Sequence, residues 1–163
     1  MTKVIVADTG PLIALALVKL LPTLSNLFAE VLVPPSVVIE ATEDISKPGA
    51  QAIKLALDSG LIKVHPVEVT DKFEELVELL DRGESEALAL AKQLNAVALI
   101  DERQGRKAAT KQGITVTGSA AILIKAKSAG VIDEVKPLFE ILRGHGYRMS
   151  ERLIVDVLQR CGE

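Results

Sequence analysis

The sequence predicts an α/β fold, a three-layer sandwich in which a central parallel sheet has helices on both faces. Short apolar runs alternate with helical segments along the whole chain. These runs are rich in β-branched residues and lack polar alternation, as is typical of strands buried on both faces. With 163 residues, 48% of them hydrophobic and 25% charged, the chain suits one globular domain over residues 1–163.

The first predicted strand covers residues 4–7 and ends at Asp8. Gly10 and Pro11 then turn the chain into an apolar helix that reaches residue 18, because proline suits the first helical turn. Taken alone, this stretch makes Asp8 or Thr9 the N-cap of the helix, a position that both residue types favour.

The next predicted elements follow the same alternation and are bounded by proline, glycine and capping residues. They are a short helix capped by Thr23 and ending at Phe28, a strand over 31–33, a helix from Pro35 to Thr42 that carries Glu40, a helix over 50–57 closed by Gly60, a strand over 61–64, and a helix over 73–80 opened by Thr70.

Residues 81–83 are predicted to interrupt the helical pattern before a second helix over 84–94. Its apolar stripe consists of Ala87, Leu90, Ala91 and Leu94. Glu86 flanks one edge of this stripe and Glu84 the other, so periodicity does not choose between them as site residues. Both also suit the first turn of a helix electrostatically.

A second apolar run, residues 96–100, repeats the opening pattern and ends in Asp101 and Glu102. The helix predicted next, over 103–112, carries basic residues at three- and four-residue spacings, which place them largely on one side. These residues are Arg103, Arg106, Lys107 and Lys111, and side chains of this kind can contact phosphate groups.

The remaining residues predict one more strand and three helices. The strand covers 114–117 and is followed by a helix over 120–129. The helical extension from about residue 134 to 163 then contains a helix ending at residue 142, a turn at 144–146, and a helix capped by Ser150.

The predicted topology brings several carboxylates to one edge of the sheet. Asp8 and Asp101 follow strands, and Glu40 and one of Glu84 or Glu86 lie near helix N-terminal halves, at the edge where α/β proteins bind ligands. Converging carboxylates repel one another unless a cation neutralises them. Oxygen ligands without nearby histidine or cysteine favour Mg²⁺ or Mn²⁺, the ions that assist phosphodiester hydrolysis.

In its motifs the chain resembles PIN-domain proteins, in particular the subgroup close to VapC-type toxins. The resemblance covers nearly the whole chain and depends on the order and spacing of several motifs. These are Val6-Ala7-Asp8-Thr9-Gly10-Pro11-Leu12-Ile13, Val33-Pro34-Pro35 leading to Glu40, Gly83-Glu84-Ser85-Glu86-Ala87, Leu99-Ile100-Asp101-Glu102-Arg103, and Thr117-Gly118-Ser119-Ala120-Ala121-Ile122-Leu123 with Lys125-Ala126-Lys127 and Gly130-Val131-Ile132.

The resemblance implies an endoribonuclease that depends on Mg²⁺ or Mn²⁺. It places the family's acids on Asp8, Glu40, Glu86 and either Asp101 or Glu102, with Glu84 as an alternative third ligand. Thr9 matches a family hydroxyl, and with Asp8 assigned to metal it becomes the expected helix cap. Gly10 stands where the family often has Ser or Asn. A homodimer and inhibition by a small antitoxin protein are implied in the same way.

Other functions fit less well. A haloacid-dehalogenase-type phosphotransferase needs a second acid where Gly10 stands, and no G-x-G-x-x-G follows the first strand for a dinucleotide. The alternative is a PIN-like fold that binds RNA or protein without efficient catalysis. Aromatic residues are only 2% of the chain, so base stacking would be sparse. RNA contact would depend on basic side chains, for which the candidates are Arg103, Arg106, Lys107 and Lys111.

Charge and cysteine content bear on partners and location. The net charge is −3, but residues 1–100 carry 8 Lys and Arg against 14 Asp and Glu, whereas residues 101–163 carry 11 against 8. The single cysteine, Cys161, fits a reducing compartment. Without a signal-peptide pattern or an apolar run of membrane-spanning length, we expect a cytoplasmic protein with no membrane contact.

Overall fold

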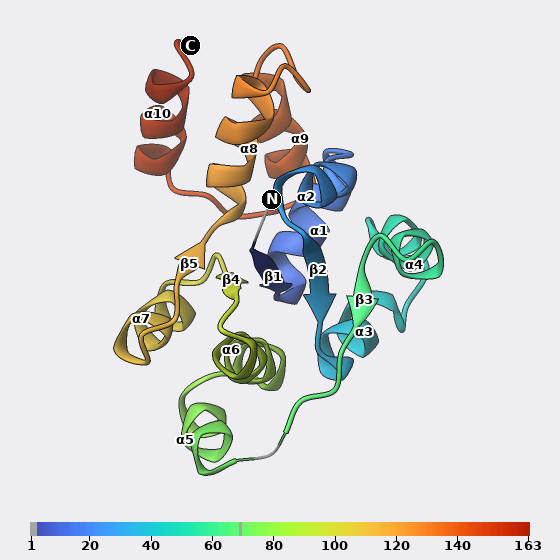
Figure 1. The fold of residues 1–163 in the computed structure, drawn as a ribbon. Helices are drawn as coiled ribbons and strands as arrows, with labels where there is room; N and C mark the ends of the chain where they lie inside the picture. Colours follow the sequence, from blue (N-terminus) through green and yellow to red (C-terminus); the bar gives the residue numbers. More distant parts are fainter. Residues whose placement is uncertain (1–2, 69) are drawn as a thin grey trace.

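The computed structural model describes residues 3–68 and 70–163, apart from the side chains of Lys72 and Val77 (Figure 1). Its strands pair in parallel in the order β3-β2-β1-β4-β5. They are β1 (Val4–Ala7), β2 (Glu30–Val33), β3 (Lys63–Val64), β4 (Val97–Leu99) and β5 (Val116–Thr117). The chain thus builds one half of the sheet outward from β1, returns to the centre, and builds the other half from β4.

Helices cover both faces of this sheet, which confirms the predicted three-layer fold. They are α1 (Thr9–Leu17), α2 (Leu21–Leu27), α3 (Pro35–Thr42), α4 (Ala50–Asp58), α5 (Asp71–Leu79), α6 (Arg82–Leu94), α7 (Arg103–Lys111), α8 (Ser119–Ser128), α9 (Lys136–Gly144) and α10 (Glu151–Arg160). Alternate strand residues face opposite layers: Val6 and Ala98 pack with α5, α6 and α7, whereas Ile5, Ala7 and Leu99 pack with the other helices.

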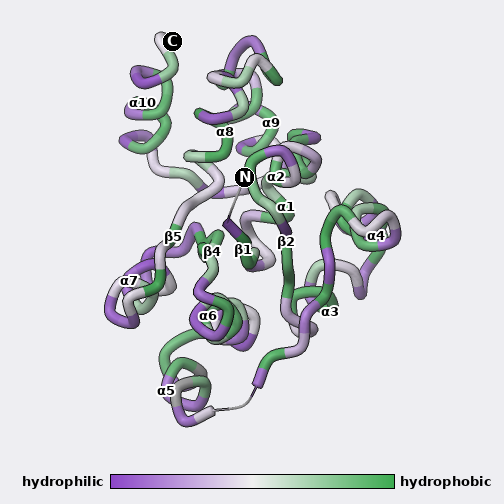
Figure 2. The backbone as a smooth tube through the Cα atoms, in the orientation of Figure 1, coloured by the Kyte–Doolittle hydropathy of each residue, from purple (hydrophilic) through white to green (hydrophobic). Residues whose placement is uncertain are grey.

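Hydropathy follows this layering. Figure 2 shows the contrast between the hydrophobic strand β2 and the hydrophilic helix α7, which covers the sheet with only Gly105 and Ala109 fully buried. In the part of the chain that the structure describes, no single helix has the length and apolarity to cross a membrane. The helices α1 and α2 meet that criterion only as a pair, across a bend of 112°.

Two helix starts differ from the prediction. Thr23 is not the cap of α2, because that helix begins at Leu21 and Thr23 lies buried inside it. The predicted break in the helical pattern is present, but it covers only Leu80 and Asp81 between α5 and α6. The Asp81 carboxylate accepts a hydrogen bond from the backbone N–H of Glu84 at 2.9 Å and so caps α6, which begins at Arg82.

The predicted helical extension packs into the same core as the sheet. Phe139 and Leu142 of α9 and Ile154 and Val157 of α10 are buried in the cluster that contains α1 and β1. Figure 1 shows α8, α9 and α10 gathered at the top of the view. This packing holds the connection between α9 and α10, residues 145–150, in a fixed place relative to the sheet.

Glu163 fastens this group of helices. Its carboxylate accepts hydrogen bonds from the backbone N–H groups of Val135 at 2.8 Å and Lys136 at 3.0 Å, at the start of α9. The Lys127 ammonium of α8 donates to it at 2.9 Å. Although desolvation opposes ionisation, these hydrogen bonds lower the pKa of Glu163 to about 2. An acidic side chain at a helix N-terminus is also favoured by the helix dipole.

We therefore predict that Glu163→Gln lowers the free energy of unfolding by about 1.5–3 kcal/mol, the range for hydrogen bonds to a charged group. Because the folded-state pKa is depressed below the ordinary 4.5, this contribution is complete above about pH 4.5 and is lost as the pH falls toward 2. Urea unfolding at pH 7 measures the loss.

The matched control for this change is Glu151→Gln, which removes an exposed ion pair with Arg143 and should change stability by less than about 1 kcal/mol. Equal unfolding midpoints for wild type and Glu163→Gln would contradict the role of Glu163 as a fastening residue.

Candidate active site

The candidate site lies where the strand order changes direction. The sheet extends one way from β1 through β2 and β3 and the other way from β4 to β5. Ala7 is in register with Leu99, and the backbone N–H of Asp8 donates to the Leu99 carbonyl at 3.1 Å, so Asp8 and Asp101 follow adjacent strand ends. This is the edge at which α/β sheets bind ligands.

A pocket of about 420 Å³ opens at this edge and collects most of the predicted acids. It is lined by Asp8, Thr9, Gly10, Pro11, Ile13, Glu40, Asp81, Glu84, Asp101, Glu102, Tyr147 and Arg148. Residues from five segments therefore meet here, and six of the lining residues are carboxylates.

Asp8 holds the N-cap position of α1 without capping it. Its backbone is extended, with φ −84° and ψ 165°, and its side chain makes no capping hydrogen bond, so the carboxylate faces the pocket. Thr9 is not the cap that we expected, because it is already the first residue of the helix. Its hydroxyl oxygen is buried and has no hydrogen-bond partner in the described part of the chain.

Glycine at position 83 lets α6 approach two acids closely. A Cβ atom at Gly83 would lie 3.0 Å from Oε2 of Glu40 and 3.4 Å from Oδ1 of Asp8. Both carboxylates therefore pack against the first turn of α6, although one follows β1 and the other lies on α3. The sequence could not have shown this contact, because it joins three separate segments.

The structure places Glu84, and not Glu86, with these acids. Glu84 lines the pocket, is only 3% exposed, and its Oε1 atom has no hydrogen-bond partner among the described residues. Glu86 accepts from Arg82 Nε at 2.8 Å and from the backbone N–H of Ser36 at 3.3 Å, and it does not line the pocket. Residues two apart on a helix point about 200° apart around its axis, so only one of them can face the acids.

Asp101 and Glu102 both reach the pocket but have different surroundings. Asp101 accepts hydrogen bonds from the backbone N–H of Ser119 at 2.8 Å, from the Ser119 hydroxyl at 2.7 Å, and from the Tyr147 hydroxyl. A Cβ atom at Gly118 would lie 2.9 Å from Asp101, so glycine is needed at that position. Glu102 is exposed and interacts with Glu84.

The basic residues of α7 lie outside the pocket. Arg106 donates from Nη1 to the Ile100 carbonyl at 3.1 Å and so supports the end of β4. Arg103, Lys107 and Lys111 are exposed on the helix surface. Their predicted contact with RNA stays a prediction.

Sequence reasoning missed three lining residues, Asp81, Tyr147 and Arg148. The first had a local signal, since Asp81-Arg82-Gly83-Glu84 has the Asp-x-x-Glu spacing of a helix start. Tyr147 and Arg148 reach the pocket because α9 and α10 pack against the core. No local sequence pattern predicts this packing.

Burial and mutual repulsion make two of these carboxyl groups weak acids. Burial raises the pKa of Asp8 to about 7, with contributions from the charges of Asp81, Glu40 and Glu102, although the adjacent Thr9 amide opposes the shift. Burial also raises the pKa of Glu84 to about 8, together with a hydrogen bond to Glu102 and nearby negative charges. Both groups would ionise more readily beside a cation.

The chemistry of the pocket fits a hard divalent cation. Carboxylate oxygens dominate its lining, and two of its lining residues, Glu84 and Thr9, have a buried oxygen with no hydrogen-bond partner among the described residues. Oxygen atoms of these kinds are ligands that suit Mg²⁺ or Mn²⁺. Among the described residues, no three Asp, Glu, His or Cys side chains already converge closely enough to hold a metal ion.

Comparison with known proteins identifies the fold family. A family model described as a PIN domain matches residues 4–163. The chain belongs to the PIN-domain family. The PIN domain is a nuclease-type fold, so the family match agrees with the acidic pocket at the centre of the sheet. It does not distinguish the VapC-like subgroup, which stays a prediction. A comparison with curated proteins found no match.

We predict that Asp8→Asn stabilises the metal-free protein at pH 8 by roughly 2–4 kcal/mol, since one pKa unit corresponds to about 1.4 kcal/mol. The folded-state pKa of about 7 lies above the ordinary 3.8. The wild-type protein should therefore lose stability as the pH rises between these values, and the variant should lose less. Chemical denaturation with EDTA at pH 4 and pH 8 measures both effects.

The control is Asp58→Asn, an exposed acid at the end of α4 that should leave stability at both pH values unchanged. A destabilised Asp8→Asn protein at pH 8, or one with the wild-type pH dependence, would show that Asp8 is not a buried, repelled carboxylate.

Proposed function

We propose that this PIN-domain protein is an endoribonuclease that depends on Mg²⁺ or Mn²⁺ and hydrolyses RNA phosphodiester bonds. One observation carries the proposal. Six carboxylates, two of them with strongly raised pKa values, line a single pocket at the switch point of the sheet. Crowding carboxylates, two of them buried, adds nothing to the stability of the fold, and such crowding is typical of cation-binding active sites.

Asp8, Glu40 and Glu84 are the residues that we assign to metal binding, with Asp101 or Glu102 as the fourth acid. We prefer Glu84 to Glu86 in this set because Glu84 lines the pocket and its Oε1 atom has no hydrogen-bond partner among the described residues, whereas Glu86 is engaged by Arg82 and Ser36. Asp81 supports the set indirectly, since it caps α6 and thereby fixes the helix turn that carries Glu84.

A bound Mg²⁺ or Mn²⁺ would supply the positive charge that activates an attacking water and stabilises the phosphate oxygens. The residues of the protein would position the ion and release protons when they bind it. Asp8 and Glu84 release protons when they become ligands, so binding should strengthen with pH. Ser119 and Tyr147 hold Asp101 by both of its oxygens, which fixes the carboxylate at the rim of the pocket.

RNA as the substrate, a toxin role, a homodimer and a small antitoxin partner are further parts of the proposal, and the resemblance to VapC-type toxins is their basis. The surface offers support for a protein partner. The large apolar side chains of Ile39, Ile45, Leu55 and Val64, on and around α3, α4 and β3, are each more than 40% exposed. Ile45 and Val64 also line one hollow beside α3, α4 and β3, and exposed apolar side chains that lie together are typical of interaction sites.

The test is cleavage of structured RNAs by the purified protein with Mg²⁺, with Mn²⁺ or with EDTA. We expect cleavage only with the divalent ions. Asp8→Asn and Glu84→Gln should each lower the rate by about 100-fold or more, because a lost metal ligand removes several kcal/mol of charge stabilisation.

Two further variants sharpen this test. Glu43→Gln, an exposed acid just beyond α3, should cleave at the wild-type rate. If a folded Glu86→Gln protein loses as much activity as Glu84→Gln, the assignment of Glu84 is wrong. Equal cleavage by wild type and Asp8→Asn, after contaminating nuclease is excluded, would overturn the proposed function and favour a binding module.

A further inference from the structure

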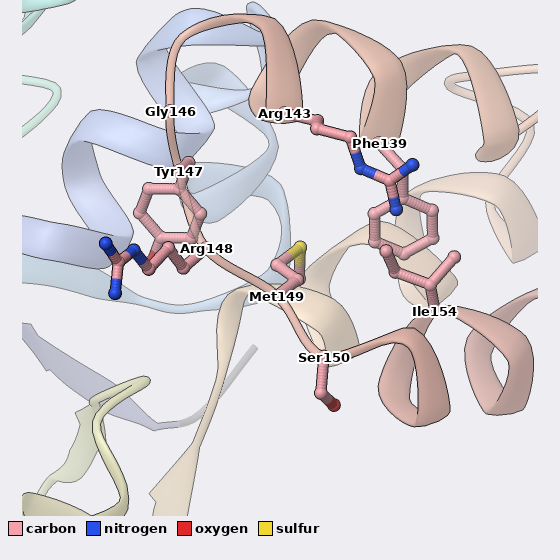
Figure 3. Close-up of a pocket in the computed structure, with 8 residues that line it drawn as sticks. All are labelled: Phe139, Arg143, Gly146, Tyr147, Arg148, Met149, Ser150 and Ile154. Carbon is pink, nitrogen blue, oxygen red and sulfur yellow. The ribbon is translucent and has the colours of Figure 1, made fainter.

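The connection between α9 and α10 borders two hollows at once. Tyr147 and Arg148 line the acidic pocket, and they also line a second hollow of about 640 Å³. The other residues that line the second hollow are Phe139, Arg143, Gly146, Met149, Ser150 and Ile154 (Figure 3). A ligand that extends beyond the acidic pocket across this connection would therefore enter the second hollow.

Tyr147 fixes the connection to the acidic pocket. Its hydroxyl donates to Asp101, and its backbone N–H donates to the Leu142 carbonyl at 2.9 Å. A Cβ atom at Gly10 would lie 3.8 Å from the Tyr147 hydroxyl oxygen, so a larger side chain at position 10 would compete for this space. The resemblance leads us to expect Ser or Asn at position 10. In this chain the residue is glycine, and the Tyr147 hydroxyl lies beside it.

Arg148 supplies positive charge where the pocket otherwise has none. It is the one cationic residue among the described residues that line the acidic pocket, and it is exposed. Within the described part of the chain it forms no ion pair. Figure 3 shows the Tyr147 and Arg148 side chains extending to the same side of the connection, away from Arg143. A guanidinium with no carboxylate partner suits a phosphate.

The second hollow combines an apolar floor with polar groups at its rim. Phe139, Met149 and Ile154 contribute apolar surface, and Arg143 contributes a second guanidinium. Arg143 is paired with Glu151 at 2.6 Å, but both side chains are more than 60% exposed. Exposed pairs of this kind contribute little, so Arg143 can exchange its partner for a phosphate at small cost.

We propose that this hollow is a nucleotide subsite for single-stranded RNA, in which Arg148 binds the phosphate next to the one held in the acidic pocket. The base of that nucleotide lies on the apolar floor, and Arg143 faces the following phosphate. The inference depends on the proposed function for its substrate class. It assigns RNA contact to the α9–α10 connection, whereas the sequence predicted such contact on α7.

RNA binding without cleavage tests the subsite. The probe is a fluorescent single-stranded RNA oligonucleotide, and anisotropy is measured with Asp8→Asn protein over a range of salt concentrations. Adding Arg148→Gln should weaken binding about tenfold and remove about one phosphate contact, which lowers the slope of log Kd against log salt by about 0.7. The control Arg152→Gln removes an exposed arginine that lines neither hollow, and it should change Kd less than about twofold.

A second readout locates the bound strand. Photo-crosslinking with an RNA that contains 4-thiouridine, followed by mass spectrometry, should label the peptide over 139–150. Crosslinks confined to 103–111, an Arg148→Gln protein with unchanged Kd and salt slope, or a parent protein that binds no RNA would each overturn the subsite. Absence of metal-dependent cleavage in the wild-type protein, with Arg148-dependent binding intact, would overturn the proposed hydrolysis alone.

Discussion

Repulsion among carboxylates at the centre of the sheet is the constraint on which the rest of the structure depends. The parallel topology places Asp8 and Asp101 on adjacent strand ends, and α3 and α6 add Glu40 and Glu84. Two of these acids are buried, and burial together with the neighbouring negative charges raises the pKa of Asp8 to about 7 and that of Glu84 to about 8. The hydrophobic core on both faces of the sheet must offset this unfavourable crowding. Acids whose ionised forms destabilise the metal-free fold but are stabilised by a bound cation are typical of functional sites.

The segment from α8 to α10 completes the site and does more than cover the sheet. It brings Ser119 and Tyr147 to Asp101, and it brings Arg148 to the edge of the acidic pocket. Glu163 fastens α9 near α8 and so preserves this arrangement. Of the basic residues in the last third of the chain, Arg148 thus lies next to carboxylates contributed mainly by the first hundred residues.

Much of the fold could be predicted from the sequence because its signals are local. Apolar runs that end in acids identified the buried strands, and glycine and capping residues identified most helix boundaries. The site was less predictable because it depends on the directions in which side chains point and on contacts between residues far apart in the sequence. Periodicity put Glu84 and Glu86 on opposite edges of one stripe, and only the packing of α6 against Asp8 and Glu40 selects Glu84 for the pocket. Tyr147 lies more than forty residues from its partner Asp101, and no spacing rule connects them.

The most direct measurement is the position of Mn²⁺ in crystals of the protein grown with that ion, determined by anomalous scattering. The structure predicts one or two peaks bounded by Asp8, Glu40 and Glu84, with the carboxylates drawn closer together than they are without a cation. A peak coordinated by Glu86, or an acidic pocket without manganese when the ion is bound elsewhere on the protein, would contradict the assignment of this pocket as the metal centre.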